Sequence, residues 1–198
     1  MGLWDALRGR RTTSAPNLDD LFLVPSAAVT LQASIGLTPT GEGSVCFRSA
    51  AGAAFEEIQT EVVALIEADP ETPEVEVTTD SFGFTWLSIE RDADDVPGLC
   101  TDLHAVNTAL ETQGFGDGLL CSLVPFRASG GARVGLVYLY KRGTFYPFAP
   151  SRQPGGQSGG GQQRDNLLEI QVRDALAGEL PVEQELSRWL AVWGAPGL

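Results

Sequence analysis

The sequence predicts an α+β domain in which helices pack on an antiparallel sheet of about five strands. Two amphipathic helical patterns and two pairs of strand-like segments joined by short turns carry this prediction. Short turns connect antiparallel neighbours, and the chain lacks the strand–helix–strand alternation of a nucleotide-binding parallel sheet. We expect one domain over residues 17–198, preceded by a separate segment and linker at 1–16.

The strands are expected at 43–48, 75–79, 84–91, 119–127 and 133–141. Turn residues at 80–83 and 128–131 predict two hairpins within this set. Trp86, Tyr138 and Tyr140 predict a second aromatic face, which is too apolar to remain in water. The C-terminal helices or a second copy of the chain could cover it, giving a monomer or a homodimer, and we expect cover from within the chain.

Apolar residues spaced three and four apart predict two long helices, at 54–68 and 95–113. The first should bury Phe55, Ile58, Val62, Leu65 and Ile66, and the second Val96, Leu99, Leu103, Val106 and Leu110. Asn17 should cap a short helix that Pro25 ends, and Asp165 one that runs to Leu176. A last short helix carries Trp189, and the Gly/Gln-rich stretch 151–163 should be a flexible loop.

The run Lys141–Pro150 combines two cations, three aromatic rings and two prolines in ten positions. We do not expect it to continue the preceding strand, because Pro147 and Pro150 have no N–H for a sheet ladder. The rings either close the core or contact a partner. The candidate partner-binding residues are Lys141, Arg142, Phe145, Tyr146 and Phe148.

The first eleven residues form a basic amphipathic segment. Leu3, Trp4 and Leu7 share one helical face, and Arg8, Arg10 and Arg11 follow. Two turns are too short for a stable isolated helix, so the segment should order only against a membrane, a partner or the domain. Since no apolar run approaches the roughly 18 residues of a membrane span and no signal peptide is evident, we expect a cytoplasmic protein whose N-terminus can contact the inner face of the membrane.

Charge is distributed unevenly along this chain, whose net charge is −13. Residues 54–118 include 16 acidic residues and a single basic one, Arg91, whereas most charged residues in 125–165 are basic. The acidic balance argues against nucleic-acid binding, which needs a basic face, and allows a basic protein partner to be steered in.

The sequence contains no recognisable catalytic or metal-binding constellation. His104 is the only histidine, and Cys46, Cys100 and Cys121 lie far apart among apolar neighbours, as buried thiols do. The glycine-rich stretches do not follow the order of a phosphate-binding loop. We therefore expect no catalytic residue, no metal and no cofactor.

Several segments together resemble the PspAB family, the PspA-associated proteins of actinobacterial phage-shock systems. They are Met-Gly-Leu-Trp-Asp-Ala-Leu at the start, Asp80–Trp86, Asp102–Asn107, Leu136–Pro150 and Trp193–Leu198. The resemblance covers the whole chain, with 153–163 as its variable part. It implies an accessory protein of envelope-stress response whose associates are PspA and the membrane protease HtpX.

The order of elements is also similar to the YbjN and type III secretion chaperone-like fold, whose members bind other proteins. The expected function is therefore a non-enzymatic adaptor that binds a protein partner such as PspA or HtpX. The alternatives are a peripheral membrane sensor acting through the N-terminus and, less favoured, a small-molecule-binding enzyme.

Overall fold

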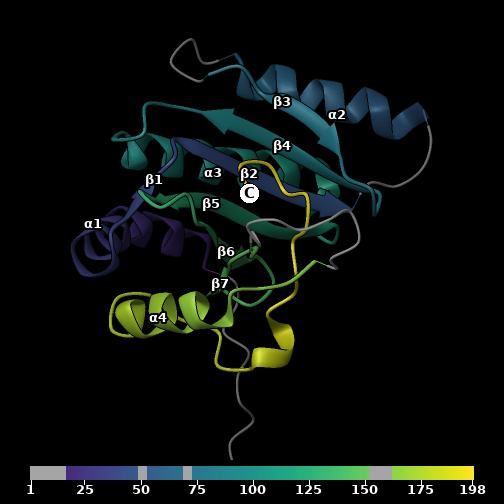
Figure 1. Cartoon of the computed structure of the whole chain (residues 1–198). Helices are drawn as coiled ribbons and strands as arrows, with labels where there is room; N and C mark the ends of the chain where they lie inside the picture. The colour runs from purple at the N-terminus through teal and green to yellow at the C-terminus, as the bar shows by residue number, and fades with distance from the viewer. Residues whose placement is uncertain (1–16, 49–52, 69–72, 152–161) are drawn as a thin grey trace, which may run out of the picture.

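An antiparallel sheet runs through the whole molecule, with strands in the order β3-β4-β2-β5-β6-β7 (Figure 1). The computed structural model describes residues 17–48, 53–68, 73–151 and 162–198, with only the backbone for 53–59. The strands are β1 (Leu37–Pro39), β2 (Glu42–Arg48), β3 (Glu76–Thr79), β4 (Phe84–Glu90), β5 (Leu119–Ala128), β6 (Arg133–Leu139) and β7 (Thr144–Phe148). All five predicted strands and both predicted hairpins are confirmed, and β1 and β7 are additional.

Strand β5 pairs along one edge with β1 and then with β2, and the two short strands meet at a break near residues 40 and 41. The carbonyl of Pro125 faces this break and accepts the Thr40 amide at 3.1 Å. The proline nitrogen therefore faces the break as well, where the missing N–H costs no ladder bond. Gly41 turns the chain at φ 90°, and a Cβ there would lie 2.2 Å from the carbonyl oxygen of Arg91.

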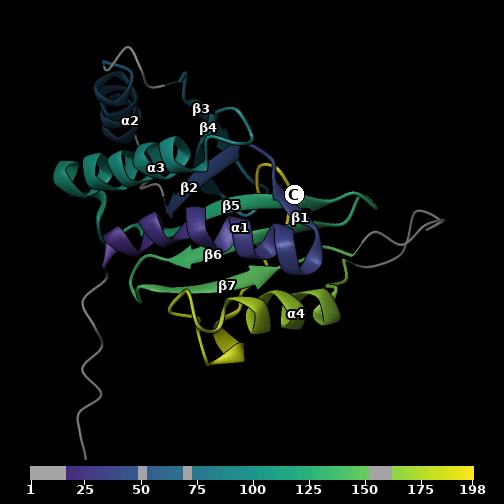
Figure 2. The ribbon, with the colours of Figure 1, turned by 90° about the vertical axis from the view of Figure 1, so that its left-hand side faces the viewer.

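The helices, apart from the short 3-10 turn η3, pack on one face of the sheet (Figure 2). They are η1 (Leu18–Leu23, 3-10), α1 (Val24–Ile35), α2 (Ala53–Ile66), α3 (Val96–Leu110), the π-helical turn η2 (Glu111–Phe115), α4 (Asn166–Leu176) and the 3-10 turn η3 (Leu186–Arg188). Asp95 and Asp165 cap α3 and α4 by accepting backbone N–H groups, as expected. Of the predicted core residues, Leu65 is exposed, and Phe55 and Ile58 lie among residues whose side chains are not described.

The first helix differs from the prediction. Asn17 makes no side-chain cap, and Pro25 does not end the helix but stands in the first turn of α1, where its missing N–H is harmless. Residues 18–35 are, among the described residues, the one helical stretch long and apolar enough to cross a membrane by length and composition alone. In this fold its buried side chains, which include Leu21 and Leu31, belong to the core.

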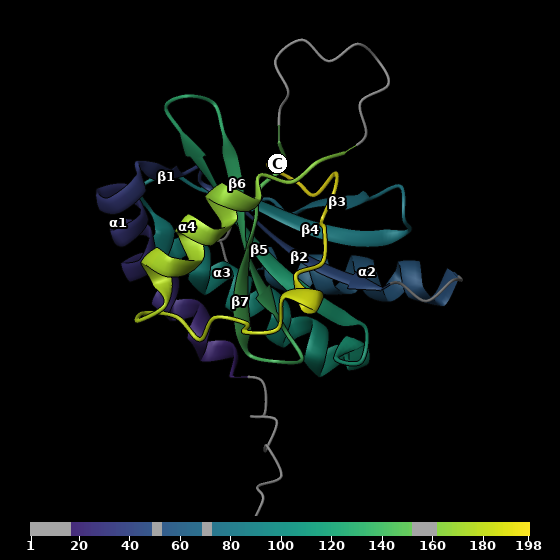
Figure 3. The ribbon, with the colours of Figure 1, turned by 60° about the horizontal axis from the view of Figure 1, so that its bottom comes forward.

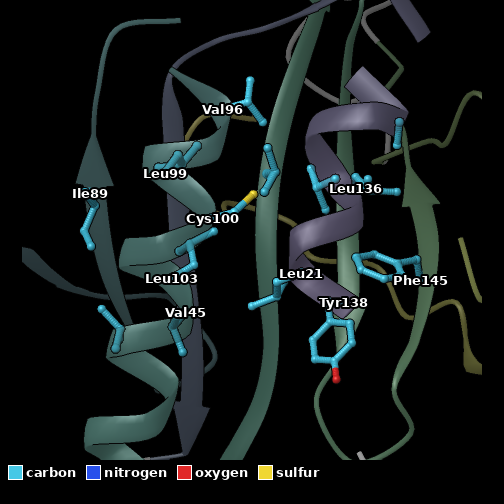
Figure 4. Close-up of a cluster of buried hydrophobic side chains, with 14 of the residues drawn as sticks. Leu21, Val45, Ile89, Val96, Leu99, Cys100, Leu103, Leu136, Tyr138 and Phe145 are labelled. Atoms are coloured by element: carbon cyan, nitrogen blue, oxygen red, sulfur yellow. The ribbon is translucent and has the colours of Figure 1, made fainter. Parts of the chain in front are cut away.

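Figure 4 shows how α3 and η1 meet the sheet in the helix-covered core. Leu99 and Leu103 of α3 lie over Gly43 of β2, whose missing side chain lets the helix approach. A buried hydrogen bond also fixes the position of α3 on the sheet, because the Asn107 side chain donates to the Ser122 hydroxyl on β5 at 2.8 Å. Arg91 forms a bidentate ion pair with the buried carboxylate of Asp102, which ties the end of β4 to α3.

The β3–β4 hairpin depends on one carboxylate. Asp80 accepts the backbone N–H groups of Phe82 and Phe84 at 2.9 and 3.0 Å, and the Trp86 indole N–H at 3.0 Å. Gly83 completes the turn at φ 83°. Burial by itself would raise the pKa of Asp80, but these hydrogen bonds outweigh it and lower the pKa below its ordinary value.

We predict that Asp80→Asn lowers the free energy of unfolding by about 1–2 kcal/mol near neutral pH, because the amide cannot replace both accepting oxygens. Since the folded pKa is lowered, the stabilisation is complete above the unfolded pKa of about 3.9 and is lost as pH falls through the folded pKa. Urea unfolding across this range measures the effect. The exposed Asp94→Asn is the control, and equal losses for both variants would contradict the assignment.

Candidate protein-binding surface

The second face of the sheet is covered by the C-terminal segment, by which we mean the last nineteen residues, 180–198 (Figure 1, Figure 3). Its first residue, Leu180, still packs in the helix-covered core. Its only regular element is the single turn η3. Trp189 and Ala195 are buried on the sheet, and Trp193 and Leu198 pack beside them. The prediction of cover from within the chain is confirmed, but helix α4 does not supply it, because Val172 and Leu176 join the helix-covered core.

The three predicted aromatic anchors are buried in β7. Phe145, Tyr146 and Phe148 have at most 1 % of their surface exposed. Phe145 turns toward the helix-covered core and contacts Tyr138 at a ring distance of 5.0 Å. A partner that meets the folded domain does not reach these rings, so we reassign them from partner contact to core closure.

Tyr146 and Phe148 hold the C-terminal segment on the sheet. The Tyr146 ring stacks with Trp189 at 6.1 Å, and its hydroxyl donates to the carbonyl of Leu190 at 2.9 Å. Phe148 meets Trp193 edge to face at 4.8 Å, and the guanidinium of Arg164 lies 5.1 Å from the centre of its ring. Tyr138 and Tyr140, by contrast, face the helices and not the second face, which corrects their predicted placement.

The two predicted cations lie at the surface near the end of β6. Lys141 is exposed and donates to the carbonyl of Asp117 at 2.5 Å. Arg142 donates to the buried carboxylate of Glu183 at 2.6 Å, and Arg188 lies 3.5 Å from the other oxygen of that carboxylate. Glu183 thus holds two guanidinium groups side by side.

The protonation of Glu183 reflects these contacts. Burial opposes its charged form, but hydrogen bonds from the Glu185 amide and from the Arg142 and Thr144 side chains outweigh burial and lower the pKa of Glu183. The carboxylate therefore stays ionised near neutral pH and keeps its hold on the two arginines.

An apolar groove of about 300 Å³ opens beside these cations, and we call it the basic groove. It is lined by Leu119, Leu120, Leu139, Lys141, Arg142, Ser187, Arg188 and Leu190. The lining contains three cations and no carboxylate, in a chain whose net charge is −13. Leu190 is 63 % exposed and its neighbour Leu186 is 59 % exposed, so apolar surface continues outside the groove.

Two other grooves differ in chemistry. One of about 560 Å³ lies between α1, β1 and the start of α3 and is mostly apolar, with Asp94 and Arg127 among its lining residues. Another of about 430 Å³ lies beside β3 and β4 and contains four glutamates, Glu42, Glu74, Glu76 and Glu90. Neither gathers exposed leucines next to a cationic rim, so the basic groove is the stronger candidate for protein contact.

The other sequence-predicted candidates for chemistry show no assembled site among the described residues. His104 stacks on Phe22 at 5.1 Å and pairs with Asp19 at 3.2 Å, at the junction of η1 and α3. Among the described residues, no group of three or more His, Cys, Asp or Glu side chains is placed to hold a metal ion. The N-terminal candidates Leu3, Trp4, Leu7, Arg8, Arg10 and Arg11 lie outside the described residues, so membrane contact stays a prediction.

These features define an α+β domain with a self-covered sheet and an apolar, cation-rimmed surface groove. Comparison with family models gives a specific assignment: the model described as PspA associated protein B matches residues 1–197. The chain belongs to this family, PspAB, which implies a link to PspA and the phage-shock response. Searches of curated proteins and of solved structures returned no match, and the similarity to the YbjN and type III secretion chaperone-like fold stays a prediction.

Four of the five segments that carry the family resemblance have structural roles in this fold, and the first, at residues 1–7, lies outside the described residues. Asp80–Trp86 is the carboxylate-held hairpin, and Asp102–Asn107 supplies the two polar links of α3. Leu136–Pro150 forms the β6–β7 pair, and Trp193–Leu198 covers the second face. The groove residues Ser187, Arg188 and Leu190 were missed, since a short polar and apolar stretch gives no periodic signal.

We predict that Phe148→Ala lowers the free energy of unfolding by about 3–5 kcal/mol, because it leaves a cavity between the sheet and the C-terminal segment. Chemical denaturation of the purified chain measures this loss. Phe82→Ala, at the exposed tip of the first hairpin, is the control and should change stability by less than about 0.5 kcal/mol. A Phe148→Ala chain as stable as wild type would place this ring outside the core.

Proposed function

We propose that this chain is a non-enzymatic adaptor of the phage-shock response and that it binds PspA through the basic groove. The family supports the link to PspA. The observation that carries the proposal is the groove itself, where exposed leucines adjoin three cations. Apolar surface at the centre of a contact supplies affinity, and a charged rim supplies orientation and rate.

The chemistry of the groove specifies the kind of segment that it accepts. A volume of about 300 Å³ accommodates one or two apolar side chains and is smaller than most small-molecule sites. Lys141, Arg142 and Arg188 favour carboxylates next to those side chains. We therefore expect an acidic amphipathic helix of PspA, with its apolar face toward Leu120, Leu139 and Leu190.

Arg142 and Arg188 are presented to this partner already oriented. Glu183 holds both, and Thr144 donates to the same carboxylate at 3.0 Å. Preorganised side chains lose less conformational entropy on binding, so this arrangement favours affinity as well as specificity. The positive charge is confined to the groove, because the exposed carboxylate of Glu185 lies next to it and accepts from the groove residue Ser187.

We predict that Leu190→Ser weakens binding of purified PspA at least about tenfold, as expected for an apolar anchor. Lys141→Glu should also weaken the binding of PspA, and the loss should grow as salt is lowered, because the new carboxylate repels the acidic residues expected on the partner. Titration calorimetry at two salt concentrations measures both effects. Leu167→Ser, at a leucine of α4 that is 69 % exposed, is the matched control and should bind as wild type does.

The same titrations test the identity of the partner. Wild-type protein that binds HtpX but not PspA would contradict the proposed partner. Equal weakening by Leu190→Ser and Leu167→Ser would contradict the proposed groove. Circular dichroism of each variant ensures that a loss of binding is not a loss of folding.

A further inference from the structure

Two of the three cysteines face one another across neighbouring strands. In the register of β2 and β5, Cys46 lies opposite Cys121, and both side chains point to the second face of the sheet. Directly opposed residues in antiparallel strands have Cα atoms about 4.5–5.5 Å apart, which falls within the range that a disulfide spans. Both cysteines are free thiols in this structure.

The pair is enclosed between the sheet and the C-terminal segment. Cys46 and Cys121 are 3 % and 5 % exposed, and they belong to the same buried cluster as Trp86, Tyr146 and Trp189. The third cysteine, Cys100, is fully buried in α3 on the helix-covered face and has no neighbouring thiol. The chain therefore contains one thiol pair and one isolated thiol, on opposite faces of one sheet.

The closed state protects the pair from reaction. The neighbouring Cys121 and burial raise the pKa of the Cys46 thiol far above its ordinary value, and burial raises the pKa of Cys100 to about 12. Because the thiolate is the reactive form, Cys46 and Cys100 remain inert while the fold is closed.

The cover over the pair contains little regular structure, since the 3-10 turn η3 is its only helix. The C-terminal segment pairs with β7 through two backbone hydrogen bonds at its start, between Phe145 and residues 181 and 183. Beyond them it is anchored to the sheet by individual side-chain contacts, such as Tyr146 to Leu190 and Arg133 to the carbonyl of Gly197 at 2.7 Å. Cys100, in contrast, lies beneath a regular helix that a buried hydrogen bond joins to β5. Segments with few backbone hydrogen bonds open locally at a lower free energy than core helices and strands.

We propose that Cys46 and Cys121 form a reversible thiol-oxidation site, which closes into a cross-strand disulfide when the C-terminal segment lifts from the sheet. A low-molecular-weight disulfide is the oxidant. One cysteine loses its proton and attacks that disulfide, which forms a mixed disulfide and releases one thiolate. The second cysteine then loses its proton and attacks the protein sulfur, which forms the Cys46–Cys121 bond and releases the second thiolate.

The electrons and protons balance in this sequence. The two cysteines are oxidised by two electrons, the small disulfide is reduced to two thiols, and the two cysteine protons end on those thiols. The product would join β2 to β5 covalently, next to the irregularity in register that follows Cys46. The basic groove contains neither cysteine, so the oxidation can be followed without PspA, but the segment that lifts carries three of the groove residues, Ser187, Arg188 and Leu190.

Incubation of the full, reduced chain with oxidised glutathione tests the site, followed by proteolysis and mass spectrometry over time. We expect a peptide pair linked through Cys46 and Cys121, while Cys100 remains a free thiol. Cys46→Ser should remove the linked pair and leave Cys121 as a mixed disulfide with glutathione.

Variants of the cover test the role of the C-terminal segment. Trp193→Ala, which removes the ring packed on Phe148, should speed formation of the linked pair about tenfold or more without speeding reaction of Cys100. Tyr146→Phe removes only the hydrogen bond to Leu190 and serves if the first variant fails to fold.

Three results would overturn the inference. Oxidation of Cys100 as fast as the pair would show that only global unfolding exposes the thiols. Separate mixed disulfides on Cys46 and Cys121, without linkage, would show that the opened strands do not hold them in bonding geometry. An unchanged rate in folded Trp193→Ala and Tyr146→Phe chains would show that the C-terminal segment is not the cover.

Discussion

The sheet of this protein has two apolar faces, and the helices α1 to α4 cover only one of them. The other face carries Trp86, Leu123, Tyr146 and Phe148, and this aromatic area cannot remain in water. The C-terminal segment covers it with tryptophans and backbone carbonyls that accept side-chain hydrogen bonds. The position of the basic groove follows from this cover, since Ser187, Arg188 and Leu190 belong to the segment.

Two buried carboxylates connect β7 to the elements around it. Glu169 of α4 accepts the Ala149 amide and the Arg164 guanidinium, both at 2.8 Å. Glu183 does the same for Arg142 and Thr144 at the opposite end of the strand. A buried charge is costly unless it is paired and hydrogen-bonded, and each of these carboxylates accepts from an arginine and at least one further donor. The pairing specifies where α4 and the C-terminal segment meet the sheet edge, and it orients two of the groove cations.

Several elements could be predicted because their signals are local. The α3 pattern with its aspartate cap and the two hairpins with their turn residues needed no distant contact, and the structure confirms them. Pro147 misled the prediction for β7. The outward-facing backbone of Phe145 bonds Pro181 and Glu183, so the nitrogen of Pro147, two residues on, also faces outward and needs no ladder partner. A proline needs a position where its nitrogen faces no ladder partner, and only the finished sheet shows whether such a position exists.

The sequence by itself determined the fold class, the helices with a regular apolar spacing, the unusual composition of Lys141–Pro150 and the family segments. Each of these features depends on residues that are close together in the sequence. It also named two of the groove cations, Lys141 and Arg142. Only the tertiary structure decided that the three rings of that run are buried, that Tyr138 faces the helices, and that Cys46 and Cys121 are opposed. These outcomes depend on strand register and on the path of the C-terminal segment. A shift of one residue exchanges the two faces of a strand, so local pattern alone cannot assign them.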